Sequence, residues 1–224
     1  MHILAINGSP RRKGNTKALL EEALAGAAEA AGPDTETRLV RLYDLQYTGC
    51  RSCFHCKKLG SDLYGHCVIK DDLKPILQEA SQADVLLLGS PIYFGYVGGM
   101  MHSFLERLLF PYLVYDREHS SLAPKHMPIG CIYTMNLSEE GVEKRGYRRR
   151  LALLEESLGL IFTRPTALWV TDTWQFSDYS RYASWLFDAE AKRRRREEHF
   201  PQDLADARAL GRKLALRAAG MQEK

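Results

Sequence analysis

The stretch that decides the fold is residues 2–16, HILAINGSPRRKGNT. Residues 2–7 form a short apolar run, and a turn containing glycine, serine and proline follows it. Beyond the turn, apolar residues recur at the spacing of one helix face, at Leu20, Ala23, Leu24 and Ala27. A buried strand that leads through a short loop into a helix is the repeating unit of α/β folds. The opening residues therefore predict a strand, a loop and a crossover helix.

The same alternation continues along the chain. Besides residues 2–7, four runs fit buried strands: Glu36 to Leu42, Asp84 to Gly89, Pro128 to Thr134 and Pro165 to Thr171. Further helices are indicated by the apolar sets Leu73, Ile76, Leu77, Ala80; Phe104, Leu105, Leu108, Leu109; Tyr147, Leu151, Leu154, Leu158; and Leu204, Ala207, Leu214, Ala218. Five strands alternating with five helices predict a doubly wound α/β sheet, in a single domain over residues 1–224.

Two connections are longer than such a fold needs. One, at about residues 47–70, carries four cysteines, and the other, at about residues 173–199, is rich in large aromatic side chains. Inserts of this length in a compact α/β domain usually build a site or an interface. We expect the aromatic side chains to be buried against another subunit, which predicts a homodimer or homotetramer. The aromatic residues concerned are Trp174, Phe176, Tyr179, Tyr182, Trp185 and Phe187.

Composition and charge exclude several classes of protein. The chain of 224 residues is 45% hydrophobic and 26% charged, and no apolar run approaches the length of a membrane span. Because the opening residues also lack a basic leader, we expect a cytoplasmic protein with no membrane partner. The net charge of +3 gives no indication of a nucleic-acid partner. We expect the basic run at residues 192–196 to be a solvated helix face, paired as Arg193 with Glu197 and Arg194 with Glu198.

The first loop suits a phosphate monoester. In an open α/β sheet, ligands bind outside the carboxyl ends of the strands, where this loop lies. A helix N-terminus offers unpaired N–H groups and a partial positive charge, and Ser9, Arg11, Asn15 and Thr16 add polar side chains. The loop lacks the Gly-Lys-Ser/Thr of a Walker A motif and the third glycine of a dinucleotide fingerprint. An ordinary turn with Asn15 as a helix cap is the alternative.

These residues also carry a resemblance. Gly8-Ser9-Pro10-Arg11 followed by Gly14-Asn15-Thr16 resembles the FMN-phosphate loop of the flavodoxin-like NADPH-dependent FMN reductase superfamily, and the whole chain is most similar to its iron-sulfur flavoprotein branch. Residues 88–95, LGSPIYFG, and the tail motifs FSDY and FPQD extend the likeness. The resemblance implies a flavodoxin-like three-layer sandwich with a five-stranded parallel sheet. It also implies FMN as cofactor and NADH or NADPH as co-substrate.

The loop after the third strand suits the flavin ring. A flavin needs a flat apolar slot with backbone N–H and C=O groups along its polar edge. The residues that can supply the slot are Pro91, Ile92, Tyr93, Phe94 and Gly95. Gly98 and Gly99 leave space above the ring for a second planar molecule. The resemblance implies that Thr134, Met135 and Asn136 close the other side. Alternatively, Tyr93 and Phe94 pack against a neighbouring subunit.

The cysteine insert, Cys50-x2-Cys53-x2-Cys56-x10-Cys67, has three interpretations. Three closely spaced cysteines and a later fourth are typical of a [4Fe-4S] cluster, which the resemblance also implies, although the last interval is longer here than in the family. Zinc would accept four thiolates, or three with His55 or His66. In the third interpretation the thiols are free. The remaining cysteine, Cys131, lies in a predicted strand, and we expect it to be buried and inert.

The sequence thus predicts an FMN-dependent oxidoreductase. Electrons would pass from reduced nicotinamide through FMN to a small acceptor, a redox protein or an iron-sulfur cluster. No catalytic acid or base is assigned. The alternatives are a non-enzymatic flavin and iron-sulfur electron carrier between protein partners, and a regulatory module acting through the basic run.

Overall fold

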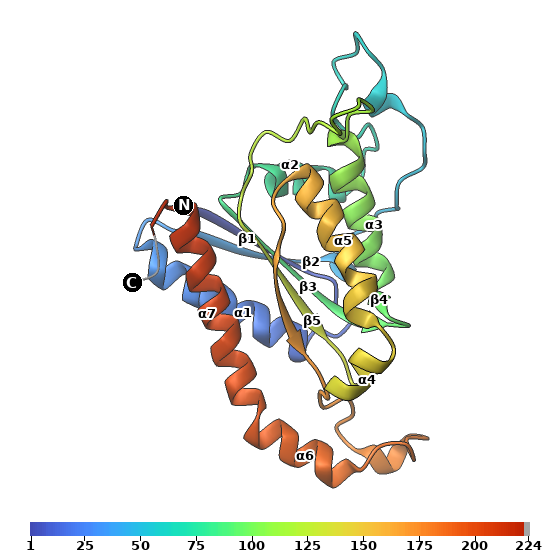
Figure 1. Ribbon diagram of the computed structural model, residues 1–224, viewed down its shortest axis with the longest axis vertical. Coiled ribbons are helices and arrows are strands. Elements are labelled where there is room, and N and C mark those ends of the chain that lie inside the picture. The colour runs from blue at the N-terminus through green and yellow to red at the C-terminus, as the bar shows by residue number, and fades with distance from the viewer. Residues whose placement is uncertain (222–224) are drawn as a thin grey trace.

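The computed structural model describes residues 1–221 and contains one central sheet (Figure 1). Five parallel strands lie in the order β2-β1-β3-β5-β6, and β4 pairs antiparallel with the end of β3. Their bounds are β1 His2–Asn7, β2 Glu36–Arg41, β3 Val85–Tyr93, β4 Tyr96–Val97, β5 Ile129–Thr134 and β6 Thr166–Val170. All five predicted strands are confirmed. The third continues four residues past Gly89, because Ile92 and Tyr93 pair with β4.

Seven α-helices connect and follow the strands. Their bounds are α1 Asn15–Ala31, α2 Leu73–Gln82, α3 Gly99–Leu109, α4 Glu139–Lys144, α5 Tyr147–Ile161, α6 Ala189–Glu198 and α7 Phe200–Ala218. The five predicted helices correspond to α1, α2, α3, α5 and α7. The sequence prediction missed α4, which has too few apolar positions to show a periodic face, and it predicted α6 only as a charged helix face at residues 192–196. Both are capped at their first turn, by the side chains of Ser138 and Asp188.

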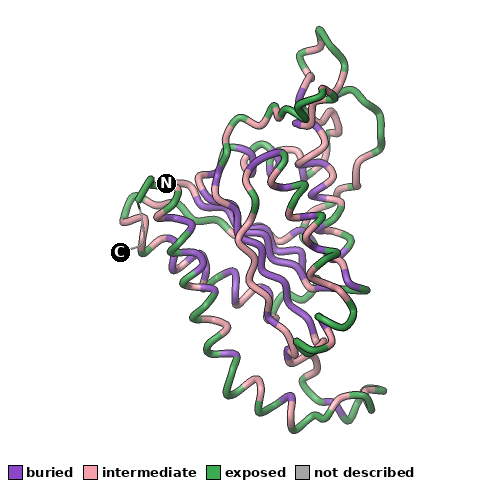
Figure 2. Tube along the Cα trace, in the orientation of Figure 1, coloured by how far each residue is buried: buried purple, intermediate pink, exposed green. Residues whose placement is uncertain are grey.

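The helices form two layers around the sheet. Helices α1 and α7 pack on one face, and α2, α3 and α5 pack on the other, with a hydrophobic cluster under each layer (Figure 1). The central strands carry the most deeply buried residues, including Ile3, Leu4 and Leu87 (Figure 2). This arrangement confirms the predicted three-layer α/β sandwich. No helix in the described part of the chain is long and apolar enough to cross a membrane.

Helices α1 and α7 approach each other unusually closely. A Cβ atom on Gly26 would lie 2.0 Å from the carbonyl oxygen of Arg208, and one on Gly211 would lie 1.8 Å from that of Ala23. Both neighbours are backbone atoms, which cannot rotate away as a side chain can. Each helix therefore needs a glycine at the point where the two backbones touch.

The two inserts extend from opposite ends of the molecule (Figure 1). The cysteine loop follows β2 and lies beside the C-terminal end of α3, whereas residues 171–188 follow β6 and lead into α6. Most residues of both segments are exposed or half-buried (Figure 2). The cysteine loop and the aromatic insert are therefore far apart in the structure (Figure 1).

Cys131 lies in the core, as the sequence predicts. Its side chain is on β5 and is 1% exposed. Burial raises the pKa of this thiol from 9.0 to about 12. Because the folded state holds the thiol proton more tightly than the unfolded state, this group's contribution to stability is complete below pH 9 and is lost as the pH rises towards 12.

We expect the cysteines to differ sharply in reactivity. Cys53 is exposed, so iodoacetamide at pH 8 should label it in the native protein, whereas Cys131 should react only after denaturation, since the thiolate is the nucleophile. Peptide mass spectrometry of native and urea-unfolded samples measures both rates. Equal labelling of the two sites in the native protein would contradict the buried position of β5.

Candidate functional site

The loop between β1 and α1 is held in shape by its own hydrogen bonds. The Gly8 N–H donates to the Gly89 carbonyl of β3 at 2.8 Å, which fixes the start of the loop against the neighbouring strand. The Ser9 N–H donates to Asn7 Oδ1 at 2.9 Å, and the Arg11 N–H donates to Ser9 Oγ at 3.3 Å. Ser9 is 5% exposed and its Oγ only accepts in these contacts. Its hydroxyl proton is therefore available for a ligand.

The first turn of α1 has no cap from a side chain. Gly14 is the N-cap residue, in an extended conformation, and the first turn contains no acidic residue. The first N–H groups of a helix need an acceptor, and together they carry about half a positive charge. Thr16 lies in this turn, and its Oγ1 is 2.8 Å from Oγ1 of Thr134 at the end of β5. The alternative in which Asn15 serves as the cap is wrong, because Gly14 occupies that position.

The predicted ring loop lies beside this first loop. Ser90 Oγ accepts a hydrogen bond from the Gly98 N–H at 3.0 Å, which ties the end of β3 to the start of α3. A Cβ on Gly98 would lie 3.6 Å from the Gly8 carbonyl oxygen and 3.8 Å from Tyr93 Cδ2. Residues 8, 93 and 98 thus meet at one edge of the sheet. A Cβ on Gly99 would meet no atom within 4 Å, so the space predicted next to this loop is open.

The ring loop turns sharply at its tip. Phe94 has φ +53° and Gly95 has φ +82°, and the Phe94 side chain is fully exposed. A left-handed conformation is unfavourable for a bulky residue and is retained mainly at functional positions. Pro91 and Ile92 belong to the strand itself. The predicted loop is therefore a strand end with a tight turn, in which Tyr93 and Phe94 present their rings to the outside.

In the third predicted segment, residues 134–136, the side chains point in different directions. Thr134 and Met135 are 4% and 5% exposed, and Met135 belongs to the main hydrophobic cluster. Asn136 is half-buried and donates through Nδ2 to Gln175 Oε1 at 2.8 Å. Thr134 thus faces Thr16 in the first turn of α1, Met135 points into the core, and Asn136 points towards the aromatic insert.

A fourth segment, absent from the sequence prediction, lies against the first loop. Asn15 Nδ2 donates to the Trp174 carbonyl at 3.0 Å, and Arg11 Nη1 donates to the Gln175 carbonyl. Arg196 of α6 donates through Nη1 to Asn15 Oδ1 at 2.6 Å. The length of the aromatic insert was the only sequence signal for this role. Arg11 and Asn15, predicted to contact a phosphate, therefore also hold the insert.

The aromatic insert packs partly on itself. Phe176 and Tyr182 stack at 4.3 Å, and Trp174 contacts Tyr179 edge-on at 5.0 Å. Trp185 is 93% exposed. Of the six aromatic residues, only Tyr179 is buried, and Trp174, Phe176 and Phe187 are half-buried by contacts within the chain, which the prediction of burial against another subunit did not include.

The polar groups at this edge fit a phosphorylated flavin. Asn7 is fully buried, and its Nδ2 has no hydrogen-bond partner in residues 1–221; the buried Asn136 Oδ1 is likewise without one there. A buried polar group without a partner is costly unless a ligand or water satisfies it. This edge of the sheet thus has three groups that can donate hydrogen bonds to a ligand: Asn7 Nδ2, the first N–H groups of α1 and the Ser9 hydroxyl. The first loop contains no carboxylate that would repel an anion. This set suits a bound dianion.

The cysteine loop places all four predicted thiols around one space. Cys50, Cys53, Cys56 and Cys67 line the same small cavity of about 20 Å³, together with Phe110 and Pro111. The thiols are free, and burial raises the pKa of Cys56. In residues 1–221, no three metal-ligating side chains are positioned to hold an ion. Four thiols are the kind of ligand that a soft metal prefers, but their positions in this structure do not form a coordination site for a cluster or for zinc.

One buried arginine joins the two ends of this loop. Arg107 of α3 has a fully buried side chain, donates to the Thr48 carbonyl at 3.1 Å, and approaches the Ile69 carbonyl at 3.4 Å. Its charge is balanced by Asp71, at 2.5 Å and 3.0 Å from its two terminal nitrogens. Asp71 Oδ1 also accepts from the Leu73 N–H at the start of α2. This pair fixes the position of the loop on the domain.

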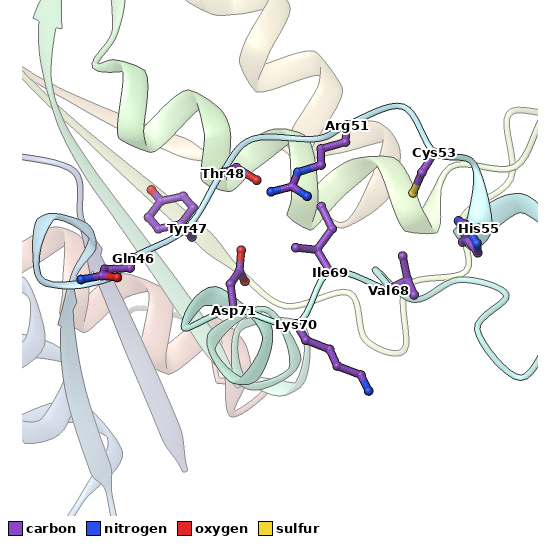
Figure 3. A pocket seen from close by; sticks show the side chains of 10 residues that line it. All are labelled: Gln46, Tyr47, Thr48, Arg51, Cys53, His55, Val68, Ile69, Lys70 and Asp71. Atoms are coloured by element: carbon purple, nitrogen blue, oxygen red, sulfur yellow. The ribbon is translucent and has the colours of Figure 1, made fainter.

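A larger cavity of about 580 Å³ adjoins the cysteine loop (Figure 3). Its basic lining residues are Arg51, His55 and Lys70, and Cys53 lies at its border (Figure 3). The Tyr47 hydroxyl donates to the Met100 carbonyl at 2.6 Å, and burial raises the pKa of Tyr47. None of the residues of the first loop or the ring loop lines this space.

Comparison with solved structures supports the class of fold, a flavodoxin-like α/β sandwich. An azoreductase from Bacillus anthracis superposes with a TM-score of 0.67 at 15% identity, covering 95% of this chain and 99% of that one. An NAD(P)H:quinone oxidoreductase from Methanothermobacter marburgensis gives a TM-score of 0.65 at 16% identity, with 96% of each chain covered. At these identities the likeness concerns the fold.

The sequence comparisons identify the family. The sequence model of the NADPH-dependent FMN reductase family matches residues 1–136, and the chain belongs to this family. An iron-sulfur flavoprotein of Methanocaldococcus jannaschii is 38% identical over 107 residues, which are 48% of this chain and 51% of that protein. One from Archaeoglobus fulgidus is 36% identical over 107 residues, 48% of each chain. The chain thus matches about half the length of these curated relatives. The predicted resemblance to the iron-sulfur flavoprotein branch is confirmed.

Proposed function

We propose that this chain is an FMN-dependent oxidoreductase that binds FMN at the carboxyl edge of the sheet. The observation that carries the proposal is the meeting of the first loop with the ring loop at Gly98, beside an uncapped α1 and Asn7 Nδ2, which has no partner in residues 1–221. Family membership supports the cofactor. An azoreductase of Bacillus anthracis with the same fold is described in complex with FMN.

The chain's own residues would bind and orient the cofactor. The N–H groups of the first turn of α1, with Ser9 and Thr16, would hold the phosphate. Pro91 to Gly95 would contact the ring, with Asn136 and its neighbours on the other side. The open space at Gly99 would admit a nicotinamide or an acceptor. FMN, when bound, supplies the chemistry by accepting a hydride from NADH or NADPH and passing electrons to a small acceptor or redox protein.

Two measurements test this proposal. Purified protein that is mixed with FMN and desalted should retain a yellow colour. Under anaerobic conditions, NADH or NADPH should bleach this colour. With an artificial electron acceptor present, the protein should oxidise NADH or NADPH at a catalytic rate. Protein that stays colourless after desalting would contradict FMN binding. Protein that holds FMN but is reduced only by a redox protein would favour the alternative, a non-enzymatic carrier.

A negative charge in the first loop should prevent binding. In the variant Ser9→Asp, a carboxylate replaces the hydroxyl proposed to face the phosphate, and two like charges about 4 Å apart near a protein surface repel by about 4 kcal/mol. We expect FMN affinity to fall at least about a hundredfold. Flavin fluorescence titration measures the change. Ser157→Asp, on the exposed face of α5, should bind as the unaltered protein does. Equal affinities would contradict the phosphate position.

The proposal includes a homodimer or homotetramer. Phe94, Trp185 and Leu186 are 100%, 93% and 88% exposed. Exposed large apolar side chains such as these are typical of subunit interfaces. A stable monomer at micromolar concentration in analytical ultracentrifugation would contradict this part of the proposal.

A further inference from the structure

Helix α6 carries five consecutive basic residues, Lys192 to Arg196, and their surroundings differ. Lys192 pairs with Asp172 and donates to the Asn136 carbonyl. Arg193 pairs with Glu190 and Glu197, as the sequence predicts for the second of these. Arg195 pairs with Asp203 at 2.5 Å, and no pair between Arg194 and Glu198 forms in the described chain. The run is therefore only partly the solvated face that its charges predict, since Lys192 is 5% exposed.

Arg196 is the basic residue of this run that reaches the first loop. Its Nη1 donates to Asn15 Oδ1 at 2.6 Å, and its guanidinium lies 3.6 Å from the centre of the Phe200 ring. Phe200 is itself buried, at 4% exposure. A guanidinium held between a buried ring and an amide has few other orientations. Arg196 is thus fixed beside the first residue of α1.

The partner of Arg196 is neutral. Within residues 1–221, no carboxylate forms an ion pair with Arg196, and Asp203 pairs with Arg195 instead. Burial, followed by the charge of Arg195, lowers the pKa of Arg196. A half-buried cation next to the positive end of a helix is unfavourable unless an anion binds there. The loop itself contains no acidic residue that could balance the charge.

Asn15 connects Arg196 to the proposed phosphate position. Its Oδ1 accepts from Arg196 and its Nδ2 donates to the Trp174 carbonyl at 3.0 Å, so both ends of the amide have a partner. The side chain of Asn15 is therefore occupied in fixing the insert, while its backbone N–H lies in the uncapped first turn. Among the cations nearby, Arg11 binds the Gln175 carbonyl and Arg12 pairs with Asp44, whereas Arg196, which is distant in sequence, contacts Asn15 itself.

We infer that Arg196 is a specificity-determining residue that makes the site prefer a flavin with a phosphate over one without. The inference rests on the proposed function. It assigns to a residue of the C-terminal segment, beyond the matched residues 1–136, a positive charge beside the phosphate that adds to the basic residues of the first loop. Lys192 contributes in a different way, by holding the Asn136 backbone.

The experiment compares FMN with riboflavin, which has the same ring and lacks the phosphate. Each is titrated into the apoprotein by flavin fluorescence at low and high salt. For Arg196→Gln we expect FMN affinity to fall about tenfold to a hundredfold, which is the range for one lost hydrogen bond to a charged group. Riboflavin affinity should change less than about twofold, and the salt dependence of FMN binding should become weaker. Arg196→Lys should recover part of the FMN affinity.

The matched control is Arg194→Gln. Arg194 has the same charge on the same helix but is exposed, so its removal should leave both affinities unchanged. Equal losses of FMN and riboflavin affinity in Arg196→Gln would mean that Arg196 only supports the loop, and would overturn the inference. Unchanged FMN affinity would also overturn it. If the unaltered protein binds neither flavin, the proposed function itself fails.

Discussion

Replacing Asp71 with asparagine should lower the free energy of unfolding by about 3–5 kcal/mol, because it leaves the charge of Arg107 buried without a counter-ion. The Arg107 side chain is fully buried, and the asparagine side chain has the same shape as aspartate. The Leu73 N–H would keep its acceptor, so the start of α2 should be unaffected. Urea denaturation measures the loss. Since Arg107 also binds Thr48 and approaches Ile69, limited proteolysis should cut the cysteine loop faster.

The neighbouring residue provides the control. Asp72 is exposed and accepts a hydrogen bond from the Gln46 N–H without an ion pair, so Asp72→Asn should change stability by less than about 0.5 kcal/mol. The double variant Asp71→Asn, Arg107→Met should recover part of the loss, since it removes the uncompensated charge. A cost below about 1 kcal/mol for Asp71→Asn would contradict the role given to the pair.

Gly211→Ala should be comparably damaging, for a steric reason. The new methyl group would overlap the Ala23 carbonyl oxygen, at 1.8 Å, and α7 can avoid it only by moving away from α1. Overpacking usually costs about 1–3 kcal/mol, and contact with backbone places this variant at the upper end. For a chain of this length that corresponds to a melting temperature lower by about 6–12 °C. Differential scanning calorimetry measures it.

Gly99→Ala is the matched substitution for this second prediction. It adds the same methyl group at a helical position with no atom within 4 Å, so its stability should be equal to or slightly above that of the unaltered protein. If Gly211→Ala melts at the same temperature as Gly99→Ala, the close crossing of α1 and α7 is wrong.

Most of the fold could be predicted from the sequence. Apolar runs predicted β1, β2, β3, β5 and β6, because buried parallel strands need continuous apolar residues. The extension of β3 was not predicted, and α6 was predicted only as a charged helix face around its basic run, without its bounds. Helix α6 depends on the Asp188 cap and on ion pairs such as Arg193 with Glu190, and no apolar period marks these. The end of β3 depends on pairing with β4, which a single run cannot indicate.

The candidate site was predictable only where its residues follow strands. The two loops after β1 and β3 could be expected to meet, since parallel strands end at one edge. The contacts of Asn15 with Trp174 and Arg196 join residues more than 150 positions apart, and nothing in the local pattern specifies them. Arg107 was also missed, because an arginine among Phe104, Leu105 and Leu108 reads as the polar side of a helix until Asp71 is seen beside it.

The close pairing of α1 with α7 affects how the protein is made. Synthesis produces α1 first, and almost 170 residues must follow before α7 emerges from the ribosome to cover it. During that interval Leu19, Leu20 and Leu24 remain uncovered on the nascent chain. Chaperone engagement should therefore persist until α7 has left the ribosomal exit tunnel, and a nascent chain with α7 still in the tunnel should be cut by protease faster than the released chain.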